Sequence, residues 1–151
     1  KKDSRWFILI VENIFENKIF PELKKYVEEK SIYKPTVTKA MPQQSKVFPI
    51  VPVKLLPVTN KYNNLSYGEE TYTFGIEINV YSMVSGRTSK RTICNEVTEQ
   101  VVDYFKNNYH VTVKTELDAL NTDSNVHRNI VKITGKLDTK YGLDNLVIYP
   151  N

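Results

Sequence analysis

The alternation of apolar and polar residues between Glu70 and Ser82 constrains the fold of this chain more than any other feature of its sequence. A period of two places successive side chains on opposite faces of a β-strand. One face carries the apolar residues Tyr72, Phe74, Ile76, Ile78 and Val80. The other carries Thr73, Glu77, Asn79 and Tyr81, which are polar without being densely charged. We therefore expect a strand that is buried on one face and meets solvent or a partner on the other.

Two segments have apolar residues at helical spacing. The first runs from Ser4, which we expect to be the N-cap, to Lys30. Pro21 predicts a break or kink near Asn17 to Phe20, after which it opens a short second helix. The second segment runs from Arg87 to Asn108. Its apolar stripe consists of Ile93, Val97, Val101, Tyr104 and Phe105, with Cys94 at the border.

The remaining segments predict shorter strands and turns. Pro49 and Pro52 cannot donate to a ladder, so Val47 to Leu56 is predicted to be an edge or irregular strand. Pro57 to Gly68 is interpreted as a hairpin loop, because it is rich in Asn, Pro and Gly. The other expected elements are a polar arm at Ser31 to Lys46 with a short strand at Thr36 to Lys39, and strands at Tyr109 to Leu117 and Asn125 to Leu137 around a turn at Asp118 to Ser124.

The order of these elements predicts an α+β fold. Strands joined by short turns favour a mainly antiparallel sheet of about four strands, and two helices with one apolar stripe each favour packing on one face of it. The order is α-β-β-α-β-β within a single domain over residues 1–151. Residues 138–151 contain a last apolar patch, Leu146 to Tyr149, with two alternatives: an extra strand or an extended C-terminal arm.

Composition narrows the classes of protein that fit. A chain of 151 residues can bury a core without disulfides or metal, and the single cysteine excludes an intramolecular disulfide. The longest apolar run, Trp6 to Val11, is much shorter than the ~20 residues that cross a bilayer. No small-residue cleavage site follows this run, so we expect neither a signal peptide nor a membrane partner. The net charge of +4 comes from basic residues scattered among acidic ones, so no specific nucleic acid partner is expected.

Catalytic and metal-binding patterns are absent from the sequence. It contains no phosphate-binding loop, no GxGxxG and no GxSxG elbow. Cys94 borders an apolar stripe, so we interpret it as a core residue rather than a nucleophile paired with His110 or His127. Both histidines are expected at the surface, and the acidic residues Glu69, Glu70, Asp118 and Asp123 are expected in solvated turns. We therefore expect no enzyme activity, no cofactor and no metal.

Exposed tyrosines and basic residues indicate a protein interface instead. Tyrosine offers ring area and a hydroxyl group, and it is enriched where proteins meet. Basic residues at the start of a helix oppose its dipole, so an acidic neighbour would stabilise them. The residues selected as contacts with a neighbouring subunit or another protein are these tyrosines and basic residues, together with two acidic residues of the turn and the central strand: Tyr62, Tyr67, Glu69, Glu77, Tyr81, Arg87, Lys90 and Arg91.

Three segments in this order resemble a known family. They are an FPIV strand at Phe48 to Val51, YTFGIEINVYS at Tyr72 to Ser82, and ICNEVTEQVVDYF at Ile93 to Phe105, with an amphipathic helix before them and two strands after. Over about Val11 to Leu137, the chain resembles tail-terminator (tail-completion) proteins of long-tailed bacteriophages and phage-tail-like particles. The resemblance rests on the order of the elements and on the residue patterns within them, rather than on a catalytic signature.

The resemblance implies a structural virion protein. Such a protein forms a hexameric ring at the head-proximal end of the tail, stops polymerisation of the tail tube and joins it to the head connector. The implied partners are other copies of the chain, the tail tube, the connector and, as a further candidate, the sheath; the implied location is the virion, and the host cytoplasm during assembly. Two alternatives stay open: another head–tail connector or neck protein of similar fold, and a basic nucleic-acid-binding α/β module, although no RNP-like aromatic–basic motif appears.

Overall fold

The computed structural model describes residues 4–39, 47–57, 59–64, 69–138 and 147–149, with side chains described for 8–39, 47–57 and 73–136. The helical elements are α1 (Ser4–Ile14), the π-helix η1 (Phe15–Ile19), α2 (Phe20–Lys30) and α3 (Lys90–Asn108). The strands are β1 (Thr36–Thr38), β2 (Ile50–Leu55), β3 (Thr59–Asn64), β4 (Glu69–Ser82), β5 (Thr112–Glu116), β6 (His127–Asp138) and β7 (Val147–Tyr149).

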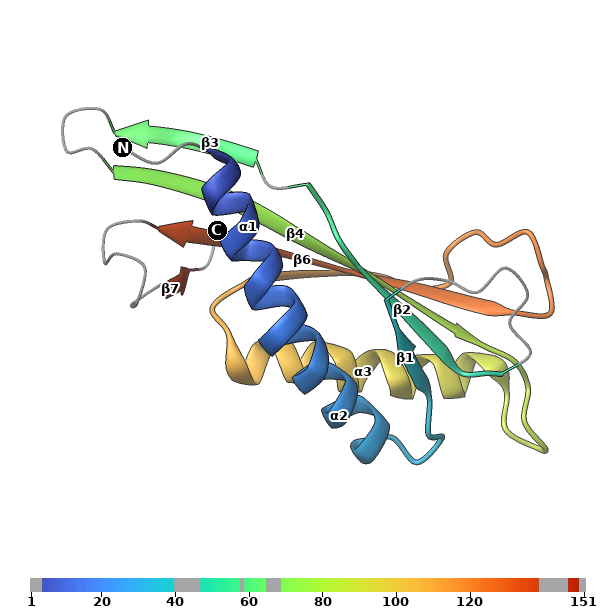
Figure 1. The fold of residues 1–151 in the computed structure, drawn as a ribbon. Coiled ribbons are helices and arrows are strands. Elements are labelled where there is room, and N and C mark those ends of the chain that lie inside the picture. Colours follow the sequence, from blue (N-terminus) through green and yellow to red (C-terminus); the bar gives the residue numbers. More distant parts are fainter. Residues whose placement is uncertain (1–3, 40–46, 58, 65–68, 139–146, 150–151) are drawn as a thin grey trace.

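All seven strands belong to one sheet, in which β4 and β6 form the long central pair (Figure 1). The order across the sheet is β1-β2-β4-β6-β5, while β3 pairs with β4 and β7 pairs with β6 farther along. Only the β1–β2 pair among these is parallel. The α+β class and the mainly antiparallel sheet are therefore confirmed, but the expected number of about four strands is too low. The expected order α-β-β-α-β-β is wrong, because β1 to β4 lie between α2 and α3, and β5 to β7 follow α3.

The N-terminal helix runs without interruption from α1 through η1 into α2. The π segment occupies Phe15–Ile19, at the position where Pro21 predicted a break, and the Phe20 amide donates to Phe15 O. Proline has no N–H and its ring crowds the carbonyl one turn earlier, so a wider i→i+5 turn lets the helix continue. The predicted kink is thus a π segment, and the helix does not break.

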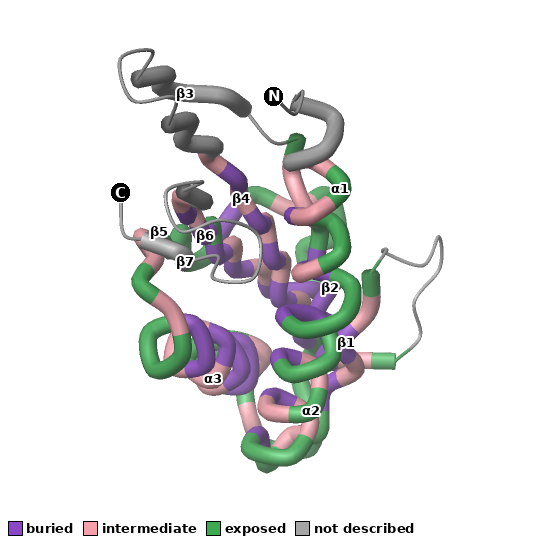
Figure 2. Tube along the Cα trace, turned by 60° about the vertical axis from the view of Figure 1, so that its left-hand side comes forward, coloured by how far each residue is buried: buried purple, intermediate pink, exposed green. Residues whose placement is uncertain are grey.

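The hydrophobic core lies between one face of the sheet and the helices (Figure 2). The alternate residues Phe74, Ile76, Ile78 and Val80 of β4 are all buried, as the alternation predicts. In β6, Val131 and Ile133 are paired with Ile78 and Ile76 and lie on the same face. The helices contribute the buried residues Val11, Phe15, Ile19, Leu23, Val27, Cys94, Val97, Val101 and Phe105.

Two predictions about the strands need correction. The region Pro57 to Gly68 is not wholly a loop, because Thr59–Asn64 forms β3 against β4. The prediction that Val47 to Leu56 is an edge strand is wrong, because β1 pairs with β2 on the side away from β4. The strand is irregular as expected: its ladder with β4 passes from Ile50 to Val53 and is interrupted at Val51 and Pro52.

The second predicted helix begins three residues later than the sequence indicated. Ser89 is the N-cap of α3 and its side chain accepts a hydrogen bond from the Thr92 amide, so Arg87 lies in the turn before the helix. At the C-terminus, β7 forms the extra strand, while residues 139–146 and 150–151 lie outside the described residues.

Candidate functional site

The face of the sheet that points away from the helices, here called the outer face, carries a charged row across four strands. In register, Lys54 of β2 lies beside Glu77 of β4, Glu77 beside Lys132 of β6, and Lys132 beside Lys114 of β5. Lys54, Lys114 and Lys132 are exposed. Opposite charges next to each other stabilise a sheet, whereas Lys114 beside Lys132 is unfavourable. An acidic partner would relieve that repulsion.

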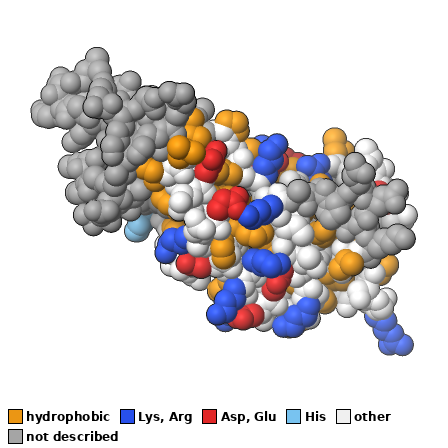
Figure 3. Space-filling model, viewed as in Figure 1, with side chains coloured by type: hydrophobic (Ala, Val, Ile, Leu, Met, Phe, Trp, Pro, Cys, Tyr) orange, Lys and Arg blue, Asp and Glu red, His pale blue; other side chains and the backbone are white. Residues whose placement is uncertain are grey.

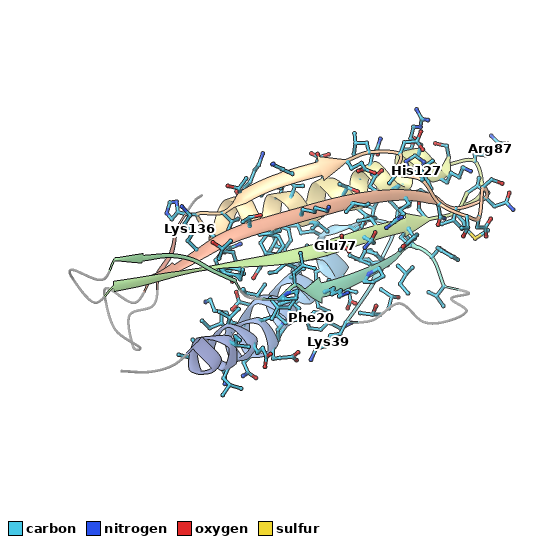
Figure 4. All side chains as sticks on the ribbon, turned by 90° about the horizontal axis from the view of Figure 1, so that it is seen from above. Phe20, Lys39, Glu77, Arg87, His127 and Lys136 are labelled. Atoms are coloured by element: carbon cyan, nitrogen blue, oxygen red, sulfur yellow. The ribbon has the colours of Figure 1, made fainter. Side chains whose placement is uncertain are left out.

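Basic residues outnumber acidic ones over the described part of the outer face. Figure 4 shows Glu77 near the middle of the sheet, with Lys136 toward one end and His127 and Arg87 toward the other. The charged residues of this face are Lys54, Lys114, Arg128, Lys132 and Lys136 on the basic side, and Glu77 and Glu116 on the acidic side. By contrast, acidic and basic side chains are interspersed over the N-terminal helix (Figure 3).

A fixed polar network occupies the end of the outer face near the start of β6. The Arg128 guanidinium lies 5.7 Å from the centre of the Tyr81 ring. Its Nε donates to Asn79 Oδ1 at 2.9 Å, and its Nη1 donates to Leu120 O at 2.9 Å. Tyr81 was selected from the sequence as an interface residue; the structure places it, half-buried, under an arginine that the sequence did not single out.

The basic residues before and at the start of α3 do not act as one group. Lys90 Nζ donates to Ser124 O, and Arg91 Nη2 lies 3.5 Å from Asp118 Oδ2. Arg87 is exposed in the turn. The β5–β6 loop therefore supplies acceptors for two of the three cations, within the chain, and lines a surface pocket of about 570 Å³ with them.

The other selected residues are only partly described. Tyr62 lies in β3 and Glu69 is the first residue of β4, but their side chains are not among those described. Tyr67 lies outside the described residues. The structure thus brings Glu77 and Tyr81 to one face and leaves Arg87, Lys90 and Arg91 at the end of the sheet.

Several tyrosines pack in the protein rather than at an interface. Tyr104 is buried, and its hydroxyl lies 3.2 Å from Tyr109 Oη and 3.3 Å from Glu22 Oε1. Burial raises the pKa of Tyr104 well above its usual range, and the neighbouring Tyr109 and Glu22 raise it further. The high tyrosine content is therefore explained in part by this cluster.

A buried polar cluster that no sequence pattern predicted lies between α3 and the start of β6. Asn129 is fully buried; its Nδ2 donates to Asn95 Oδ1 and Thr98 Oγ1, both at 2.9 Å, and its Oδ1 accepts from the Asp118 amide at 2.9 Å. His127 is also buried, with 5% exposure, so its predicted surface position is wrong. Its register with Ser82 places it on the inner face, and its Nδ1 lies 3.6 Å from Asp118 Oδ1.

Cys94 belongs to this buried region, as expected for a core residue. Its Sγ lies 3.2 Å from Val80 O and 3.8 Å from the backbone O of His127. Burial raises the pKa of the Cys94 thiol to about 11. Because the thiolate is the reactive form, the residue is poorly suited to nucleophilic chemistry.

We expect Cys94 in the folded protein to react with a disulfide reagent at pH 8 at least about a hundredfold more slowly than in urea, because it is buried and protonated. The folded pKa of Cys94 lies above the ordinary value of 9.0, so keeping this thiol protonated contributes to the stability of the fold. That contribution is complete below pH 9 and is lost as the pH rises to about 11. Absorbance of the released thiol measures both rates. Equal rates would mean that Cys94 is not buried between α3 and the sheet.

Among the described residues, no group of three or more His, Cys, Asp or Glu side chains could hold a metal ion. No helix in the described part of the chain has the length and apolar character needed to cross a membrane. No protein-family model matches the chain, and no curated protein is significantly similar to it.

Proposed function

We propose that this chain is a structural subunit that assembles with other protein subunits, and that its assembly is a ring at the head-proximal end of a phage tail. The ring ends the growth of the tail tube and joins it to the head connector. The resemblance suggests this role, and a single sheet with its helices on one face and charged side chains of the described residues on the other is compatible with it.

The charged row on the outer face is the observation that carries the proposal. Helices cover one face of the sheet, and the exposed Lys54, Lys114 and Lys132 lie in one line on the other. The sheet register fixes the spacing of the backbone positions that carry these lysines, which suits a protein partner with acidic residues at matching spacing. A ring requires contacts between different surfaces of neighbouring subunits, and this face provides one of them.

The experiment compares tails from a phage that lacks the gene with tails restored by variants. We expect tails of uncontrolled length, or heads without joined tails, when the gene is absent. Lys132→Glu reverses the centre of the charged row and should restore correct tails at least about tenfold less often than the wild type.

Lys25→Glu is the matched control, because Lys25 is exposed on α2, away from the outer face. It should restore tails as well as the wild type does. Both variants must show unchanged thermal unfolding before their effects are compared. Normal tails without the gene would refute the proposal. Normal tails with Lys132→Glu would mean that the outer face is not a contact surface in the assembly.

A nucleic-acid-binding module is the second candidate, favoured by the excess of basic residues on the outer face. Such binding depends on counterion release, so affinity for an oligonucleotide would fall steeply between 50 and 200 mM salt, the range over which phosphate contacts weaken by orders of magnitude. Fluorescence anisotropy with a labelled oligonucleotide separates the candidates. Salt-dependent binding that Lys132→Glu abolishes would favour this one.

A further inference from the structure

The two edge strands of the sheet, β1 and β5, differ in whether their outward-pointing backbone groups have hydrogen-bond partners. At one edge, the β1 residue Val37 directs its backbone toward α2. Its amide donates to Glu28 Oε2 at 3.0 Å, and its carbonyl accepts from Lys24 Nζ at 2.9 Å. Lys24 and Glu28 also pair with each other at 2.6 Å. Both backbone groups are thereby satisfied, and a further strand cannot add here without displacing the pair.

At the other edge, two backbone positions of β5 face away from the sheet. The Leu56 amide donates to Gly75 O, so odd-numbered residues of β4 direct their backbone groups toward β2 and even-numbered residues toward β6. Even-numbered residues of β6 then face β5, in agreement with the hydrogen bond from the Ala119 amide to Arg128 O. By the same alternation, Val113 and Thr115 of β5 point outward.

Among the residues that the structure describes, this second edge is accessible. Figure 2 shows β5 at the margin of the sheet beside β6. Lys114, Thr115 and Glu116 are exposed, and Leu117 is 58% exposed. Within the described part of the chain, no hydrogen bond reaches the backbone of Val113 or Thr115 from a side chain or another loop. An open strand edge with unpaired backbone groups is a template for another strand.

The sequence of β5 is complementary to itself in one antiparallel register. If Thr115 faces Thr115 of a second copy, Lys114 faces Glu116 and Val113 faces Leu117, each pair occurring twice. Thr115 points its backbone outward, so the central pair exchanges two hydrogen bonds. Lys114 and Glu116 then meet at the closer, non-hydrogen-bonded positions on the outer face. Val113 and Leu117 meet on the helix side, where Leu117 loses its exposure.

We propose that two copies of this chain pair through their β5 edges, antiparallel and centred on Thr115, to form one continuous sheet. The pairing is isologous, so it closes at two copies and leaves both outer faces free for other contacts. Charge complementarity identifies a second copy as the occupant, because a shift by two residues places Lys114 opposite Lys114 in one direction and Glu116 opposite Glu116 in the other. The inference does not rest on the proposed role in phage tails.

The test measures the mass of the full chain by sedimentation equilibrium at protein concentrations from 1 to 200 µM. This range is roughly that of the dissociation constants expected of a small interface. We expect a dimer whose dissociation constant rises at least about tenfold in Thr115→Pro, which removes two central hydrogen bonds. Proline is tolerated at an edge position whose N–H points outward, so the variant should unfold at the wild-type temperature.

Charge exchange supplies the matched controls. Lys114→Glu and Glu116→Lys each place like charges opposite each other and should weaken the dimer about tenfold. The double variant restores opposite charges and should restore the wild-type dissociation constant. Lys25→Glu, away from the edge, should change nothing.

A wild-type protein that stays monomeric up to 200 µM would overturn the inference, because that concentration covers the roughly expected dissociation constants of a small interface. So would a dimer that Thr115→Pro leaves intact, or a double variant as weak as the single ones. A larger ring that Thr115→Pro does not affect would support the proposed function and refute the β5 pairing, so the two ideas fail separately.

Discussion

Replacing Phe105 with alanine is expected to lower the free energy of unfolding by about 4 kcal/mol, the largest effect among the substitutions considered. The side chain is 1% exposed, and its ring lies 5.2 Å from that of Tyr104 in an edge-to-face arrangement and 6.0 Å from that of Tyr109. The substitution removes buried apolar area and leaves a cavity that the sheet and helix cannot fully close. Urea denaturation followed by circular dichroism measures it.

Leu120→Ala is the control for the loss of a large apolar side chain. Leu120 is 92% exposed, so its removal should change the free energy of unfolding by less than about 0.5 kcal/mol. A loss below about 1 kcal/mol for Phe105→Ala would mean that α3 does not pack on the sheet as described. The assignment of the inner and outer faces of the sheet would then also be wrong, because it depends on the packing of α3.

The second large effect is expected at Asn129, where replacement with alanine should lower the free energy of unfolding by about 3 kcal/mol. The side chain makes three hydrogen bonds in a fully buried place, and its loss leaves the Asp118 amide without its acceptor. Each buried hydrogen bond contributes about 1 kcal/mol, and a partner left unsatisfied costs more. Thermal and urea unfolding of the variant give the difference.

Asn125→Ala is the matched control, because Asn125 is exposed and makes its hydrogen bond to Asp123 through the backbone. It should lie within about 0.5 kcal/mol of the wild type. A Thr98→Ala/Asn129→Ala double-mutant cycle adds a further check: the two losses should not be additive, since Thr98 Oγ1 accepts from Asn129. Additive losses would contradict the network.

The central strand and the second helix were predictable because their patterns are local. In β4, burial alternates without exception from Thr73 to Val80, as the residue types alternate. The start of β6 could not be predicted in this way. His127 and Asn129 are polar, yet they occupy inner-face positions. Asn129 is satisfied there by residues of α3 and of the β5–β6 loop, which lie about thirty and about ten positions away in the sequence. Such partners are visible only after folding.

The strand β3 was missed for a different reason. Its sequence, TNKYNN, has the asparagines typical of a loop, and its pairing with β4 depends on backbone groups rather than on side-chain pattern. The same limit applies to the candidate site. Glu77 and Tyr81 could be assigned to one face from the period of two, whereas Lys54, Lys114 and Lys132 are aligned only by the register of four strands.

The π segment at Phe15–Ile19 has a consequence for the length of the N-terminal helix. It holds about one residue more than a regular helix would need to cover the same distance, and it thereby keeps Val11 and Phe15 in line with Leu23 and Val27. A related chain with one residue fewer in the segment Phe15–Ile19 would retain the same buried stripe in an unbroken α-helix. A second residue lost there would turn one half of the helix about 100° away from the sheet.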